Sequence, residues 1–156
     1  MARSVFFSFH YERDIWRANV VRNCGVVIGH AAAGFRDGSL WEEAKRKGDA
    51  AIKKLIDEGL VGTSVTVVLI GAQTYQRPYV EYEIQQSMAR GNGLLGLNIA
   101  HIRDQSQQTD LQGPAPWSLV AGGYPIYTWG NDGQQLGVWI EEAYQRVQRQ
   151  LYRAGW

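Results

Sequence analysis

The sequence predicts an α/β fold with a central parallel sheet covered by helices on both faces. Short apolar runs, rich in β-branched and aromatic residues, alternate along the chain with segments of helical periodicity. Strands separated by helices of roughly 10–20 residues are typical of parallel sheets. The chain has 156 residues, the size of about one domain, and its 45% hydrophobic content suffices for a packed core. We therefore expect a single domain over residues 1–156.

The first half of the chain is predicted to form two strands and two helices. The apolar run at 5–9 indicates a buried strand, and apolar residues recur at helical spacing over 12–23. A second, shorter run at 26–28 indicates an edge strand. Ser39-Leu40-Trp41-Glu42 matches a capping box, which begins a helix that Gly59 ends.

The second half continues the same alternation. The segment 65–70 is uncharged and mostly β-branched, which is typical of a central strand covered on both faces. Pro78 is tolerated in the first turn of a helix, and the helical pattern continues to Arg90. The remaining predicted elements are a strand at 97–102, a polar surface excursion at 103–123, a strand at 126–129 and an amphipathic helix after Asn131-Asp132-Gly133.

Charge and composition argue against several classes of function. Sixteen Lys and Arg residues against fifteen Asp and Glu give a net charge of +1, without the basic excess of nucleic-acid-binding proteins. The single cysteine, Cys24, forms no internal disulfide, and no cysteine or histidine spacing indicates a metal site. The chain shows neither a signal-peptide pattern nor about 18 continuous apolar residues. We therefore expect a cytoplasmic protein without membrane, nucleic-acid or metal ligands.

A glycine motif at Gly91-Asn92-Gly93-Leu94-Leu95-Gly96 matches the dinucleotide-binding pattern G-x-G-x-x-G. That fingerprint requires a strand before it and a helix after it, so that the helix N-terminus faces the pyrophosphate. Here a predicted helix comes first and a predicted strand follows. We therefore interpret the motif as a helix C-cap and turn.

Glu83 is the strongest candidate for a catalytic carboxylate. Tyr79 and Glu83 are four residues apart on a predicted helix, so they share one face, close to the end where the macrodipole favours an ionised carboxylate. Such a group in a cleft can hold ribose hydroxyls and stabilise an oxocarbenium ion, as cleavage of an N-glycosidic bond requires. The pattern alone favours a simpler interpretation, in which Glu83 is a solvated first-turn residue that stabilises its own helix.

A second candidate site lies in the loop before Ser39. Phe35-Arg36-Asp37-Gly38 places an aromatic ring, a cation and a carboxylate side by side. These residues could stack on a base and pair with a phosphate. A simple turn leading into the helix explains the same residues.

Three segments resemble the TIR-like sensor proteins of the Thoeris anti-phage defence system. The first is the opening strand Ser4-Val-Phe-Phe-Ser-Phe-His-Tyr11, and the second is the W-E-E-A-K stretch that begins at Trp41. The third is Thr74-Tyr-Gln-Arg-Pro-Tyr-Val-Glu-Tyr-Glu-Ile84, in which a Ser/Thr loop precedes an aromatic residue and a glutamate follows four positions later. Together they extend the resemblance over residues 4 to about 104.

The resemblance implies a flavodoxin-like three-layer fold and an enzyme that consumes NAD. It implies Glu83 as the catalytic residue, with Tyr79 in the preceding aromatic position. It also implies a cleft at the end of the first strand; the substrate-binding candidates are Ser8, Phe9, His10, Phe35, Asp37, Thr74 and Tyr79. NAD would be the substrate and no cofactor is expected. The family product is a cyclic ADP-ribose-type signal that activates a separate effector protein after phage infection.

Two other interpretations remain open at this stage. The chain could be a non-catalytic TIR-like module that assembles with copies of itself or senses a phage component, since its six Trp and eight Tyr residues favour interfaces. It could also be a receiver-like or flavin-binding domain. A receiver, however, needs acidic residues at its strand ends, where this chain has Ser8 and His10.

Overall fold

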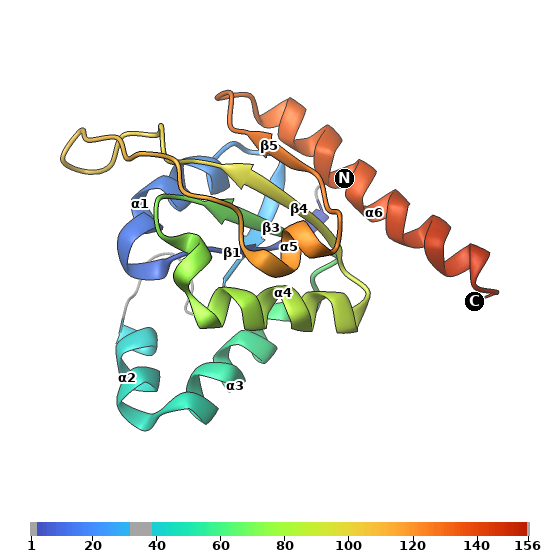
Figure 1. Ribbon diagram of the computed structural model, residues 1–156, viewed down its shortest axis with the longest axis horizontal. Coiled ribbons are helices and arrows are strands. Elements are labelled where there is room, and N and C mark those ends of the chain that lie inside the picture. The colour runs from blue at the N-terminus through green and yellow to red at the C-terminus, as the bar shows by residue number, and fades with distance from the viewer. Residues whose placement is uncertain (1–2, 32–38, 156) are drawn as a thin grey trace.

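A computed structural model describes residues 3–31 and 39–155, except for the side chains of Ser39 and Leu40. Its centre is a five-stranded sheet whose strands are all parallel, in the order β2-β1-β3-β4-β5 (Figure 1). The strands are β1 (Arg3–Ser8), β2 (Val27–His30), β3 (Val65–Ile70), β4 (Gly93–Asn98) and β5 (Ile126–Thr128). The α/β fold class predicted from the sequence is confirmed.

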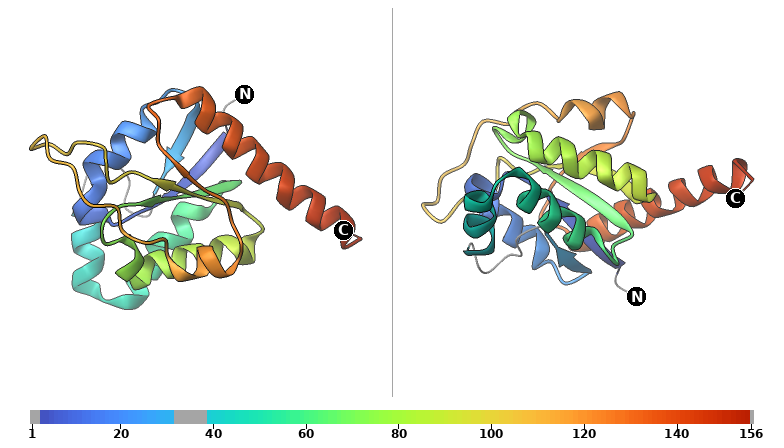
Figure 2. Two further views of the ribbon diagram at one scale, coloured as in Figure 1. Left: turned by 45° about the horizontal axis from the view of Figure 1, so that its top comes forward. Right: turned by 90° about the horizontal axis from the view of Figure 1, so that it is seen from below.

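Helices cover both faces of the sheet and give three layers (Figure 2). They are α1 (Tyr11–Arg22), α2 (Ser39–Lys47), α3 (Asp49–Leu60), α4 (Pro78–Arg90), α5 (Trp117–Ala121) and α6 (Gly133–Arg153), with a 3₁₀ turn, η1, at Thr74–Gln76. One face packs against α1 and α6 through residues such as Ala18 and Ile140. The other face packs against α3, α4 and α5 through Ile56, Ile84 and Leu119. No helix among the described residues combines the length and hydrophobicity needed to cross a membrane.

The order of the strands determines where a site can form. Strand β1 pairs with β2 on one side and with β3 on the other, with Ser8 opposite Val68. The chain therefore adds β2 on one side of β1 first, and then crosses to the other side of β1, where it adds β3, β4 and β5. Ligands of open α/β sheets bind at this reversal, beyond the carboxyl ends of the strands. Here that position lies beyond the ends of β1 and β3.

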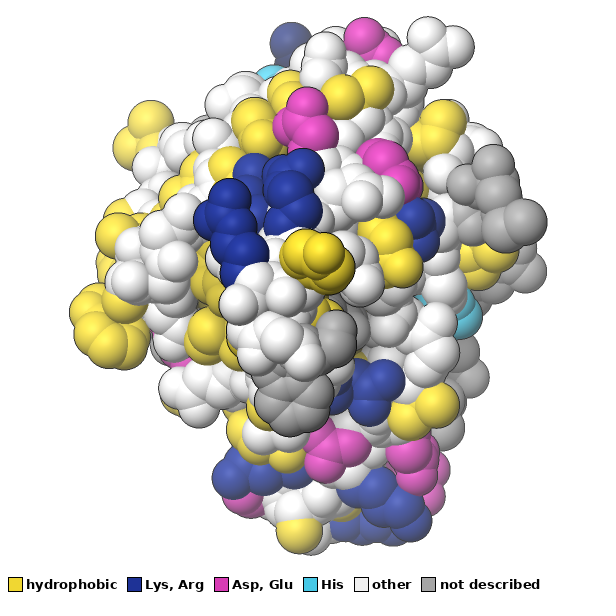
Figure 3. Space-filling view, turned by 90° about the vertical axis from the view of Figure 1, so that its right-hand side faces the viewer, with side chains coloured by type: hydrophobic (Ala, Val, Ile, Leu, Met, Phe, Trp, Pro, Cys, Tyr) yellow, Lys and Arg dark blue, Asp and Glu magenta, His cyan; other side chains and the backbone are white. Residues whose placement is uncertain are grey.

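The helix predicted from Ser39 to Gly59 is wrong as a single element, because it is divided into α2 and α3 at Gly48. Gly48 has φ +107°, a backbone conformation open to glycine and strained for other residues. The chain turns there, and α3 packs against the sheet. Basic and acidic side chains intermingle over this end of the molecule (Figure 3), and ion pairs such as Lys47–Glu43 (2.8 Å) and Lys53–Asp49 (3.1 Å) join them.

The strand predicted at 97–102 is also misplaced, since β4 begins four residues earlier at Gly93. Gly91 does end α4 in a left-handed conformation, as the C-cap interpretation of the glycine motif expects. The later glycines, however, belong to the strand. A side chain at position 93 would lie 2.7 Å from the carbonyl oxygen of Ala143 in α6, so the absence of a side chain lets α6 lie directly on β4.

The polar segment at 103–116 has no helix or strand, but it is firmly attached to the body. Arg17 of α1 is buried and donates hydrogen bonds to the carbonyl oxygens of Ile102 (2.7 Å) and Gln108 (2.9 Å). The same guanidinium pairs with Asp14 at 2.9 Å and Asp110 at 3.1 Å. The later part of the predicted excursion contains the short helix α5.

Candidate active site

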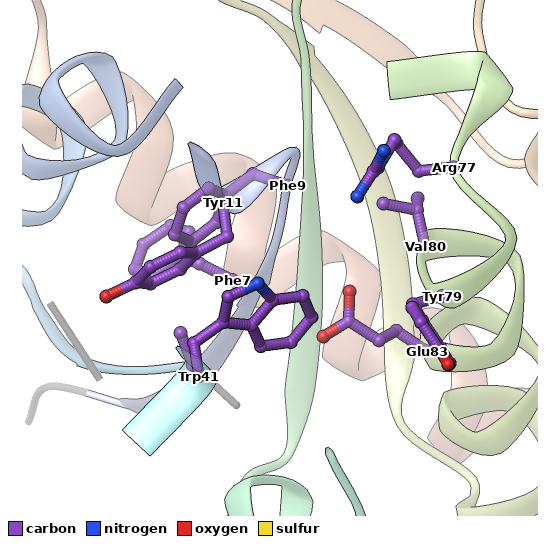
Figure 4. A pocket seen from close by; sticks show the side chains of 9 residues that line it. Phe7, Phe9, Tyr11, Trp41, Arg77, Tyr79, Val80 and Glu83 are labelled. Carbon is purple, nitrogen blue, oxygen red and sulfur yellow. The ribbon is translucent and has the colours of Figure 1, made fainter. Parts of the chain in front are cut away.

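A small pocket lies at the reversal of strand order, at the end of β1 where the sequence predicts the cleft. Five segments contribute to it: the end of β1, the start of α1, the end of β2, α2, and the start of α4. Figure 4 shows its side chains converging from both sides. The lining residues are Phe7, Phe9, Tyr11, Ala31, Trp41, Arg77, Tyr79, Val80 and Glu83.

Glu83 supplies the carboxyl group of the pocket. It is the sixth residue of α4, and its side chain is 6% exposed. The hydroxyl of Ser8, at the end of β1, donates a hydrogen bond of 2.7 Å to Oε1 of Glu83. No hydrogen bond to Oε2 is made within the described part of the chain, so this second oxygen is the one available to a ligand. Tyr79 lies one turn earlier on the same face, as the i, i+4 spacing predicts.

Burial controls the ionisation of Glu83. Removal of the carboxyl from water raises its pKa to about 8, and the hydrogen bond from Ser8 opposes that rise. The position of Glu83 near the helix N-terminus predicted that the helix dipole would favour the ionised form, but that effect fades beyond the first turn and Glu83 lies in the second. At neutral pH the carboxyl of the ligand-free protein is therefore mainly protonated. A ligand that brings positive charge beside it would favour loss of the proton.

One wall of the pocket is built from aromatic rings. The ring centroids of Phe9 and Tyr11 are 5.9 Å apart and those of Tyr11 and Trp41 are 5.5 Å apart, both in stacked arrangements. Trp41 in turn meets Tyr79 edge to face at 6.2 Å. The hydroxyl of Tyr79 donates to Asp49 at 2.9 Å, which ties α4 to α3. A flat, π-rich wall of this kind suits a base or a pyridine ring.

Arg77 brings positive charge to the pocket. It occupies the N-cap position of α4, directly before Pro78. No carboxylate in the described ranges forms an ion pair with its guanidinium, whereas the buried Arg17 pairs with Asp14 and Asp110. A guanidinium without an ion-pair partner, beside an aromatic wall, is suited to bind phosphate oxygens.

The remaining candidates from the sequence lie in different places. His10 is the N-cap of α1, where its Nδ1 accepts from the backbone N–H of Arg13 at 3.2 Å, and burial lowers its pKa. Thr74 is buried in the turn after β3, where its hydroxyl accepts from the N–H of Gly71 at 2.8 Å. Neither lines the pocket. Phe35 and Asp37 lie outside the described residues.

Six residues that line the pocket were not among the site residues predicted from the sequence: Phe7, Tyr11, Ala31, Trp41, Arg77 and Val80. Of these, Tyr11, Trp41 and Arg77 bring the aromatic and charged groups, and the sequence offered them only as members of the motifs that carry the resemblance. Arg77 did carry a usable signal, because it directly precedes Pro78, which marks the first turn of the helix that carries Tyr79 and Glu83. The positions of Trp41 and Tyr11 depend on tertiary packing between α1, α2 and α4, which periodicity does not report.

The fold and the site together define a class: α/β domains with flavodoxin-like strand order and a carboxyl group buried in the crevice beside β1. The chain belongs to the TIR-like domain family of the Thoeris protein ThsB, whose family model matches residues 6–104. A protein of Bacillus cereus (strain MSX-D12) with the provisional name cyclic ADP-D-ribose synthase ThsB1 is 46% identical over 138 residues. That match covers 87% of this chain and 69% of the relative. The resemblance found in the sequence is confirmed.

Proposed function

We propose that this protein cleaves NAD at the bond between nicotinamide and ribose and closes the remaining ADP-ribose into a cyclic nucleotide. The observation that carries the proposal is the Glu83 carboxyl, held by Ser8 in a pocket with an aromatic wall. The name of the Bacillus cereus relative, a cyclic ADP-D-ribose synthase, supports the same reaction.

The chemistry follows from the charges of substrate and pocket. The nicotinamide ring of NAD is a cation, and it leaves as a neutral molecule with the electron pair of the broken C–N bond. No strong general acid is therefore needed, and the positive charge moves to the ribose as an oxocarbenium ion. The ionised carboxylate of Glu83 stabilises that ion.

Ring closure then needs a nucleophile from the same molecule. A hydroxyl or an adenine nitrogen attacks the oxocarbenium carbon, and one proton is released to solvent. Water competes for the same carbon, so the buried position of Glu83 and the aromatic wall favour cyclisation by keeping water away. Arg77 binds the phosphates and holds the substrate in the folded shape that closure requires.

The wider roles of the reaction belong to the same proposal. The cyclic nucleotide diffuses to a separate effector protein and activates it, and a phage-derived trigger starts synthesis. Self-association of the chain accompanies the active state. The family supports a role in Thoeris defence, since the matching domain is that of a Thoeris protein.

The direct test is mass spectrometry of NAD incubated with wild-type protein, Glu83→Gln and Glu81→Gln. Glu81 is the matched control, because it lies on the same helix but bonds to Ser118 of α5. We expect nicotinamide and a cyclic ADP-ribose isomer from the wild type and from Glu81→Gln, and at least about a hundredfold less from Glu83→Gln.

Extracts of phage-infected cells that express each variant provide the second arm, because a triggered enzyme is inactive without its trigger. Equal NAD consumption by wild type and Glu83→Gln in both arms would overturn the proposed role of Glu83. Absence of any product from wild type in both arms would instead favour the non-catalytic interaction module.

A further inference from the structure

We propose that Ser8 is a positioning residue for Glu83: it fixes one carboxyl oxygen so that the other faces the reacting ribose. The inference rests on the proposed function, and it gives Ser8 a role different from the direct substrate contact considered from the sequence. Ser8 acts through Glu83 and does not itself touch the substrate.

The geometry assigns this role through a single contact. Ser8 is completely buried and is absent from the residues that line the pocket, whereas Glu83 lines it. The hydroxyl donates to Oε1 of Glu83 across a sequence separation of 75 residues and joins the end of β1 to the second turn of α4. The contact thus joins a strand and a helix, and such elements hold a catalytic side chain more precisely than loops do.

No other group among the described residues bonds to the Glu83 carboxyl. Helix α4 itself contributes Tyr79 to the pocket and its N-cap contributes Arg77, while α1 and α2 contribute Tyr11 and Trp41. None of these is a cause of the shifted Glu83 pKa: burial is the dominant cause, and the Ser8 hydrogen bond acts against it. Loss of the hydroxyl would therefore leave a buried carboxyl free to rotate and harder to ionise.

Two effects on catalysis follow. A carboxylate without its donor loses a charge-assisted hydrogen bond, which raises its pKa by roughly one to two pH units. A rotating side chain also spends less time directed at the ribose. We expect kcat/KM at pH 7 to fall roughly ten- to hundredfold in Ser8→Ala, with part of that loss recovered at higher pH.

The experiment compares Ser8→Ala with Ser87→Ala. Ser87 is the matched control, because it is also completely buried and also contacts Glu83, but through the backbone carbonyl oxygen at 2.7 Å. The pH profile of kcat/KM for NAD is measured for both variants and for wild type. The acid limb of the Ser8→Ala profile should move to higher pH by roughly one to two pH units, and that of Ser87→Ala should stay in place. Ser8→Thr, which keeps the hydroxyl, should restore the limb.

A carbon-13 NMR titration of the Glu83 carboxyl separates this inference from the proposed function, because it needs no turnover. A higher Glu83 pKa in Ser8→Ala but not in Ser87→Ala supports the contact even if NAD is not consumed. An unchanged Glu83 pKa and an unmoved acid limb in a folded Ser8→Ala would overturn the positioning role.

Discussion

Glu83 shows how one residue can serve two opposing requirements. Stabilising an oxocarbenium ion needs a carboxylate, whereas burial favours the neutral acid and raises its pKa to about 8. A cationic nicotinamide ring beside the carboxyl favours the charged form, so substrate binding itself prepares the group. The pocket is then most polar when substrate is present and least polar when it is empty.

Arg77 is a second pocket residue whose proposed role, phosphate binding, can be tested by a single substitution. Since its guanidinium has no ion-pair partner in the described ranges, its removal leaves no buried charge unpaired. We expect Arg77→Gln to raise the KM for NAD roughly tenfold or more, with little change in melting temperature. Arg90→Gln, an exposed position at the other end of α4, is the control for general loss of charge. Equal KM values for both variants would contradict phosphate binding by Arg77.

At the residue scale, the sequence predicted the contacts that local geometry sets. Tyr79 and Glu83 share a face because they are four apart on one helix. The Ser8–Glu83 hydrogen bond was beyond reach, because it joins residues 75 apart and depends on how α4 packs against β1. Ser8 and Glu83 were therefore both chosen as site residues without any indication that they touch.

At the scale of elements, uninterrupted patterns were predicted well and local breaks were not. Strand β3 has the predicted bounds, because its uncharged, mostly β-branched run lies between two glycines that mark where a strand can begin and end. The break between α2 and α3 was missed because apolar residues keep helical spacing across Gly48. Periodicity does not show whether a glycine within such a segment continues the helix or takes a positive φ and ends it. That choice depends on how the segments on either side pack against the rest of the protein.

Gly48→Ala tests whether that break matters. A Cβ added at position 48 would have nothing within 4 Å, so the substitution introduces backbone strain without a clash. We expect it to lower the free energy of unfolding by about 1–2 kcal/mol. It should also reduce NAD turnover, because α2 carries Trp41 into the pocket.

Gly137→Ala is the opposite control for the same substitution. Gly137 lies inside α6, and its new Cβ would make ordinary contact with Val26 at 3.7 Å. We expect a gain of about 0.5–1 kcal/mol in urea melts and no change in turnover. A neutral or stabilising Gly48→Ala would show that the break between α2 and α3 imposes no strain on an ordinary residue.

At the scale of the whole molecule, the alternation of strands and helices established the class but not the order of the strands. Periodicity reports which face of an element is buried and not which neighbour it meets. The order β2-β1-β3-β4-β5 brings the ends of β1 and β3 to the reversal point, and this places residues 8 and 83 in one site. Only the resemblance to TIR-like proteins supplied that arrangement in advance.

The stability of the whole molecule should record the cost of a buried carboxyl. Glu83 has a pKa of about 8 in the folded state and an ordinary value of 4.5, so the folded state binds the extra proton between these limits. The raised pKa therefore adds its full contribution to the free energy of unfolding below about pH 4.5, and this contribution is lost as the pH rises to about 8. Glu83→Gln is neutral throughout and does not suffer this loss.

Urea melts of wild type and Glu83→Gln at about pH 5 and about pH 8 therefore have a definite expected outcome. From pH 5 to pH 8, the free energy of unfolding of Glu83→Gln should rise relative to that of wild type, by an amount on the order of a few kcal/mol. The reason is that the variant has no charge to bury at the higher pH. Glu141→Gln is the control, since the hydrogen bond and ion pair with Arg3 lower the Glu141 pKa from 4.5 to about 2, and its contribution to stability therefore changes only below the pH range of these melts. This variant should differ from wild type by nearly the same amount at both pH values. A constant difference between wild type and Glu83→Gln across this pH range would mean that the carboxyl ionises freely in the empty pocket. Burial would then not be what holds Glu83 neutral until substrate arrives.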